Sequence, residues 1–184
     1  VLTKEMYKNF MVKVFADYQD KHKEFDKYEN FSIERVGGIK FLRKIRKAQL
    51  VNEFLKENKV EGIIADHWKS LELIKTDIKK YCLIHSKEIN HPQGSNINKR
   101  VLKVLNNVQK IISNSKFTKD LAIKNGVNEK KIIVINPGVE PTTELNKELL
   151  NKVEKLFKNR SPKLITVSRF DKRKNHEKII MSLR

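Results

Sequence analysis

A strand, a basic turn and a helix follow one another in the stretch Lys163-Leu-Ile-Thr-Val-Ser-Arg169-Phe-Asp-Lys-Arg-Lys174-Asn-His-Glu-Lys-Ile-Ile180. Leu164 to Val167 is short, apolar and rich in β-branched residues, which predicts a buried strand. Residues 171–175 are polar and basic and predict a turn. Residues 177–183 predict a helix, because three apolar residues share one face: Ile179, Ile180 and Leu183.

The turn carries two cations that suit a diphosphate. Open α/β sheets bind ligands at the carboxyl ends of their strands, and a helix that begins there attracts phosphate through its free N–H groups. Arg169 supplies a fork-shaped guanidinium and Lys174 an ammonium. We therefore expect Arg169 and Lys174 to bind a diphosphate. The alternative is a solvated basic turn in a Lys-rich chain.

Strands and helices also alternate through the earlier part of the chain. Apolar runs predict strands over residues 31–36, 60–65, 80–84, 110–113 and 131–135. Helical spacing of apolar residues predicts helices over residues 39–58, 71–78, 97–108 and 116–124, the last capped by Ser115. Residues 10–18 suit a helix and residues 20–30 a loop. This alternation predicts an α/β protein with a Rossmann-like, mostly parallel sheet and flanking helices.

Three parts are expected along the chain. Residues 1–140 form an incomplete Rossmann-like domain, residues 141–161 a helical linker, and residues 162–184 the start of a second domain. The linker helix is predicted from a stripe of apolar residues at Leu145, Leu149, Val153 and Leu156. Because the chain opens on Val1 and stops inside a helical pattern, we expect a piece of a longer protein that is inactive alone.

Polar side chains follow two successive predicted strands. Asp66 and His67 come after the strand at residues 60–65, and His85 and Glu88 follow the strand at residues 80–84. The carboxyl ends of strands are where a doubly wound sheet places a site. A histidine after a strand is also common as a purely structural residue, so both interpretations stay open.

The chain is strongly basic and has one cysteine. Its 184 residues carry a formal net charge of +18, and Cys82 alone can form neither an internal disulfide nor a Cys-based zinc site. With a single cysteine, a reducing cytoplasm is the simplest setting. No apolar run approaches the roughly 20 residues of a membrane span. The charge suits an anionic membrane face, a nucleic acid or phosphorylated ligands, and it also suits the compositional drift of an A+T-rich coding sequence.

Residues 40–47 form a basic amphipathic segment, Lys40-Phe-Leu-Arg-Lys-Ile-Arg-Lys47. One interpretation is a solvated helix face. The other is contact with anionic lipid headgroups, which would make the protein peripheral at the inner membrane face.

Three segments together resemble a GT-B glycosyltransferase of the family-4 type, the "glycosyl transferases group 1" proteins. Ile111-Ile-Ser-Asn-Ser115-Lys-Phe-Thr118-Lys-Asp-Leu121 resembles the family's SxxT–helix stretch. Ile133-Val-Ile-Asn136-Pro137-Gly138-Val139-Glu140 resembles its PNGVD turn with the middle residues in another order. Residues 164–169 with Lys174-Asn175 resemble its donor-diphosphate motif. The order and the approximate spacing of the segments also match, and the resemblance covers residues 60–184.

The resemblance implies two Rossmann-like domains that face each other across a cleft. The first binds the acceptor and the second binds a nucleotide-sugar. It implies transfer of a hexose from a nucleotide-diphosphate sugar to a glycan or lipid-linked acceptor of the cell envelope, with retention of configuration. No metal and no cofactor besides the donor are expected, since no Asp-x-Asp pair stands out.

The resemblance also implies roles for individual residues. His85 and Glu88 are expected to be catalytic, with His85 at the donor sugar and Glu88 at a hydroxyl group. Asp66 and His67 are expected to contact the acceptor or the sugar, and Arg169 and Lys174 the donor diphosphate.

The sequence departs from the family pattern in three ways. The first strand and its Gly-rich loop, and the later Glu-x7-Glu segment, are not found, and Ser168 replaces a usual Gly. Two alternatives stay open. One is a basic nucleic-acid-binding module, although aromatics make up only 8% of the chain and no RNA-binding signature is present. The other is another GT-B enzyme, such as a sugar-nucleotide epimerase.

Overall fold

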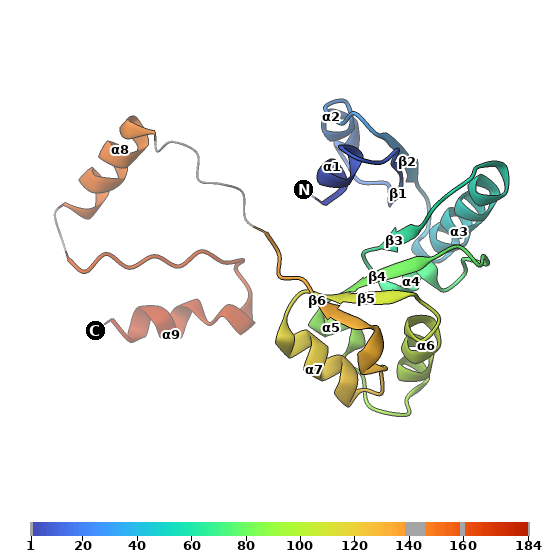
Figure 1. Cartoon of the computed structure of the whole chain (residues 1–184). Helices are drawn as coiled ribbons and strands as arrows, with labels where there is room; N and C mark the ends of the chain where they lie inside the picture. Colours follow the sequence, from blue (N-terminus) through green and yellow to red (C-terminus); the bar gives the residue numbers. More distant parts are fainter. Residues whose placement is uncertain (1, 139–145, 159–160, 184) are drawn as a thin grey trace. The chain divides into compact units, whose positions relative to one another are not determined.

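The computed structural model describes residues 2–138, 146–158 and 161–183 (Figure 1). The chain divides into two compact units, Val1–Gly138 and Val139–Arg184. Among the described helices, none combines the length and the apolar character that crossing a bilayer requires.

The first unit begins with a small parallel sheet and three helices. Strands β1 (Lys13–Asp17) and β2 (Ser32–Val36) pair in parallel, and the helices are α1 (Leu2–Tyr7), α2 (His22–Asp26) and α3 (Lys40–Glu57). The strand predicted at residues 31–36 and the helix predicted at residues 39–58 are confirmed.

Two predictions near the N-terminus are wrong. The helix predicted at residues 10–18 is strand β1, because its backbone bonds to β2 and Phe15 packs edge-on against Phe54 of α3 at 5.7 Å between ring centroids. These long-range contacts override a weak local pattern. The loop predicted at residues 20–30 contains the short helix α2.

A second parallel sheet of four strands follows. Its order is β3 (Ile63–Ala65), β4 (Lys80–Ile84), β5 (Lys110–Ser113) and β6 (Ile132–Val134), the chain order. All four strands run in parallel, so their carboxyl ends meet at one edge. The predicted strands are confirmed, with β3 shorter than expected at its start.

Helices and a 3-10 turn η1 (Glu129–Lys131) connect the strands. The helices are α4 (Trp68–Leu71), α5 (Ser86–Ile89), α6 (Asn96–Leu105) and α7 (Lys116–Lys124). The predicted helices at residues 97–108 and 116–124 are confirmed as α6 and α7. Ser115 caps α7 as predicted, since its Oγ accepts a hydrogen bond from the backbone N of Thr118 at 3.1 Å.

The prediction of a helix at residues 71–78 is wrong. The helix observed in this region ends at Leu71, where the predicted helix was expected to begin. Helix α4 covers only Trp68–Leu71. The backbone that follows bonds to Asn52 of α3: its Nδ2 donates to the carbonyl of Leu73 and its Oδ1 accepts from the N–H of Lys75, both at 3.1 Å. Backbone groups held by a neighbouring helix are not free for a helical ladder.

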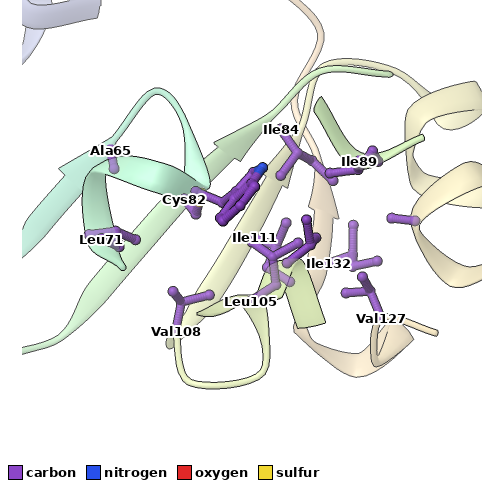
Figure 2. Packing of buried hydrophobic residues seen from close by; sticks show 13 residues of the cluster. Ala65, Leu71, Cys82, Ile84, Ile89, Leu105, Val108, Ile111, Val127 and Ile132 are labelled. Carbon is purple, nitrogen blue, oxygen red and sulfur yellow. The ribbon is translucent and has the colours of Figure 1, made fainter. Parts of the chain in front are cut away.

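The core lies on one face of the four-stranded sheet, where the helices cover it. Figure 2 shows the cluster, with Ala65 and Leu71 toward β3 and α4, and Val127 and Ile132 toward β6. Alternate strand residues point into it, as a two-residue period requires. Its strand members are Ala65, Cys82, Ile84, Ile111 and Ile132, and its helix members include Trp68, Leu71, Ile89, Val101, Leu105 and Ala122.

The second unit contains helix α8 (Lys147–Phe157), a 3-10 turn η2 (Lys172–Lys174) and helix α9 (His176–Met181). Helix α9 confirms the helix predicted at residues 177–183. The helix predicted within residues 141–161 is present as α8, with Leu149, Val153 and Leu156 exposed; its role as a linker stays a prediction. Leu145 lies outside the described residues, as do Val139 and Glu140 of the proposed turn motif.

The buried strand predicted at Leu164 to Val167 is wrong. The segment is exposed, with Ile165 at 84% and Val167 at 86%, and none of its four residues is in a strand. A parallel strand is buried only where neighbouring strands and covering helices are present. The described residues of this unit form helices and a 3-10 turn and contain no strand with which the segment could pair.

Candidate functional site

His85 follows β4 and begins the short helix α5. Its backbone N donates to the carboxylate of Glu88, which lies in the first turn of α5. This arrangement is one half of a capping box, in which a carboxylate satisfies an N–H at a helix start. It therefore fixes Glu88 beside the end of β4, as the sequence predicted for a site at this edge.

His67 follows β3 and caps helix α4. Its Nδ1 accepts a hydrogen bond from the backbone N of Lys69 at 3.0 Å, which leaves the ring proton of the neutral form on Nε2. Burial lowers the pKa of His67, and the charges of Lys69 and His85 lower it further, while Glu88 and Asp66 act in the opposite direction. Burial therefore favours the neutral form of His67.

These interactions show that four predicted residues share one edge of the sheet. Ala65, the residue before Asp66, pairs with Cys82 of β4, and Nε1 of Trp68, the residue after His67, donates to the backbone carbonyl of Glu88 at 3.0 Å. His85 and Asp66 are exposed, while His67 and Glu88 are partly buried. The structure thus brings together the four residues that the sequence placed after β3 and β4.

Asn114 joins the same edge and was not singled out from the sequence. Its Nδ2 lies 3.3 Å from Nδ1 of His85, and Ser113, the residue before it, pairs with Ile84, the residue before His85. A bond donated by this amide keeps the proton of neutral His85 on Nε2. The signal was available, because Asn114 follows the third strand as Asp66 and His85 follow the first two.

The chemistry of this edge suits hydroxyl groups. Carboxylates accept hydrogen bonds from hydroxyls, and a neutral imidazole can donate one from Nε2. Cys82 lies behind the edge as a neutral thiol, since burial raises its pKa to about 12, so it is not a nucleophile. Within the ranges that the structure describes, His, Cys, Asp and Glu nowhere form a group of three or more that could hold a metal ion.

Arg169 and Lys174 lie in the second unit, in a loop that is held by hydrogen bonds and an ion pair within the loop. Asp171 accepts from the backbone N of Arg173 at 2.9 Å and pairs with the Arg173 guanidinium at 3.0 Å, which lowers the pKa of Asp171 to about 2. The ring of His176 bonds through Nε2 to the carbonyl of Arg169 at 3.1 Å.

Both predicted diphosphate residues are exposed. Among the ion pairs of the described residues, Arg173 is occupied by Asp171, whereas Arg169 and Lys174 take part in none. Their guanidinium and ammonium groups therefore keep their donors for a ligand.

A sequence model of Glycosyltransferase Family 4 matches residues 2–143, which is most of the chain. The chain belongs to Glycosyltransferase Family 4. The family resemblance is thereby confirmed. The match reaches further toward the N-terminus than the three segments did, and it ends before the donor-diphosphate segment at residues 164–175.

The fold is similar to that of Anabaena HepE, solved in complex with UDP. The two structures align with a TM-score of 0.56 at 15% sequence identity, over 80% of this chain and 49% of HepE. The chain thus spans about half the length of HepE. The predicted Rossmann-like α/β fold is confirmed by this likeness. No curated protein matches the sequence.

Proposed function

We propose that the chain is part of a glycosyltransferase that moves a hexose from a nucleotide-diphosphate sugar to a glycan or lipid-linked acceptor, with retention of configuration. The observation that carries the proposal is the group of Asp66, His67, His85 and Glu88 at one sheet edge of a family-4 chain. The UDP bound to HepE supports a uridine nucleotide as a first probe.

The reaction breaks the bond between the anomeric carbon and the diphosphate oxygen, through an oxocarbenium-like state. The bond that forms joins the anomeric carbon to the acceptor oxygen, and the proton of that hydroxyl passes to the departing diphosphate. His85 contacts the donor sugar through Nε2, and Glu88 and Asp66 accept hydrogen bonds from hydroxyl groups. Neutral His67 adds a donor without adding charge.

Arg169 and Lys174 stabilise the departing diphosphate. Negative charge grows on the diphosphate as the sugar leaves, and cations directed at that charge lower the barrier. The exposed loop at residues 168–176 offers both cations, and its Asp171–Arg173 pair gives the loop a defined shape.

Calorimetric titration of the chain with UDP tests the proposal. Arg169→Ala or Lys174→Ala is expected to weaken binding about tenfold, because each change removes a charge-assisted hydrogen bond to phosphate. Lys172→Ala is the matched control, since it removes an exposed cation from the same loop. Equal binding by all three variants and the unchanged chain would remove the diphosphate assignment.

The acceptor is proposed to reach the protein at an anionic membrane surface on the cytoplasmic side. Helix α3 begins with the basic segment at residues 40–47, but three of its cations are engaged inside the fold. Arg43 and Lys47 pair with Asp17 at 3.4 and 2.7 Å, and Lys44 pairs with Glu72. The surface that we propose for lipid therefore rests on Lys40 and Arg46, which are both exposed.

A sugar-nucleotide epimerase remains the second candidate. It would convert a UDP-hexose without any acceptor, whereas the transferase consumes the donor in proportion to the acceptor glycosylated.

A further inference from the structure

Trp68 links the two strand ends that carry the candidate site. It follows Asp66 and His67 directly in the chain, and its side chain is fully buried at 0% exposure. Its Nε1 donates a hydrogen bond to the backbone carbonyl of Glu88 at 3.0 Å. The bond therefore joins the turn after β3 to the helix α5 that follows β4.

Glu88 is held at both its backbone and its side chain. Its carbonyl accepts a second hydrogen bond, from Nε2 of His91 at 3.1 Å, and its carboxylate accepts from the backbone N of His85. His85 and His91 lie within three residues of Glu88, so their hydrogen bonds are local. The hydrogen bond from Trp68 is the one that comes from the end of the neighbouring strand β3.

The Trp68 ring is held in place by apolar packing and by two nearby cations. It belongs to the core cluster with Cys82 and Ile84. The Arg100 guanidinium lies 5.6 Å from its centroid and the Lys69 ammonium 5.4 Å, distances at which cations are attracted to an indole face. A ring held in this way presents its N–H in one direction.

We propose that Trp68 is a positioning residue, which fixes the spacing between the turn at His67 and the turn at His85 and Glu88 through its bond to the Glu88 carbonyl. Trp68 contacts no reacting atom and acts only through the backbone of α5. The activity measurement below rests on the proposed function, while the other two measurements do not.

Trp68→Phe removes the N–H and keeps an aromatic ring. Helix α5 is expected to loosen, so the amides of His85 and His91, which bond to the Glu88 carboxylate and the Ile89 carbonyl at the two ends of α5, exchange with solvent about tenfold faster. Water then reaches His67, whose pKa is lowered chiefly by burial, and the NMR titration midpoint of its ring moves upward. In the full-length protein, turnover of a UDP-hexose is expected to fall about tenfold in kcat with little change in KM, because the reacting groups are misaligned.

Ile132→Val is the matched control. Ile132 is buried in the same core, at the start of β6, and its truncation costs about as much stability as the loss of one hydrogen bond. A merely structural role predicts that both variants change stability while the exchange of α5 and the titration of His67 stay as in the unchanged chain. That outcome would overturn the proposal.

A second substitution covers the case in which Trp68→Phe does not fold. The chain has one tryptophan, so biosynthetic replacement by benzothienylalanine alters this position alone. The analogue keeps the bicyclic shape and puts sulfur in place of the N–H. Faster exchange of α5 and a raised His67 midpoint are expected again, and unchanged values would overturn the proposal. If these two readouts respond while the full-length protein turns over no UDP-hexose, the proposed function fails and the positioning role stands.

Discussion

At the scale of single residues, Glu72 joins three parts of the first unit. Its carboxylate accepts from Nε and Nη2 of Arg100 on α6 at 2.7 and 2.8 Å, and it also pairs with Lys44 on α3. These hydrogen bonds, led by those from Arg100, lower the pKa of Glu72 to about 2. The charged form of Glu72 is therefore favoured by folding.

The consequence is a pH-dependent stability. A carboxyl whose pKa is lower in the folded state stabilises the fold above its unfolded pKa of about 4.5 and loses that effect as the pH falls toward 2. Glu72→Gln is expected to lose about 2 kcal/mol in urea denaturation at pH 7 and to match the unchanged chain near pH 2. Glu129→Gln, which breaks the exposed pair with Lys119, serves as control and should change little. A Glu72→Gln deficit that persists at pH 2 would contradict the ion-pair account.

At the scale of elements, capping decides where the helices begin. Ser115 accepts from the N–H of Thr118, and the residues around this cap supply Ser113, Thr118 and Ala122 to the buried interior. Ser115→Ala is expected to lower the unfolding free energy by about 1 kcal/mol, because one N–H at the start of α7 loses its partner. Ser115→Asp keeps an acceptor and should retain most of the stability. Equal losses for the two variants in thermal denaturation would show that the hydroxyl is not acting as a cap.

The elements also show what the sequence could predict. The caps at Ser115 and the apolar runs of β4 and β5 act locally, so their signals were sufficient. Strand β1 was missed because its partner β2 lies far along the chain. The end of α4 was missed because Asn52, on another helix, holds the backbone at Leu73 and Lys75.

Part of the candidate site could likewise be predicted from the sequence, and part of it could not. Asp66, His67, His85 and Glu88 were predicted to gather because parallel strands end at one edge, a rule that needs only the strand positions. The anchoring of Glu88 by Trp68 could not be predicted, since it depends on which backbone carbonyl a buried indole meets. The assignment of Arg169 and Lys174 stays a prediction.

At the scale of the whole molecule, the net charge of +18 raises the question of whether binding to anionic lipid is local or general. A double charge reversal at Lys40 and Arg46 is expected to reduce co-sedimentation with phosphatidylglycerol-containing vesicles at least about tenfold, since each basic residue near the surface contributes about 1 kcal/mol. Reversal of Lys99 and Lys103, exposed on α6, changes the net charge equally and is the control. Equal losses of co-sedimentation for both pairs would mean that vesicle binding depends on the net charge of the protein and not on the basic residues at the start of α3.

The central claim is that the edge formed after β3 and β4 receives the donor sugar. The most direct measurement is NMR of the histidine rings during titration with UDP-glucose, UDP-galactose and UDP-N-acetylglucosamine. We expect at least one of them to shift the His85 and His67 resonances, while UDP alone shifts them less and His22, bonded to the carbonyl of Gln19, stays unchanged. Calorimetry shows independently whether these nucleotide-sugars bind. If they bind and the resonances of His85 and His67 shift no more than those of His22, the sheet edge is not the sugar site.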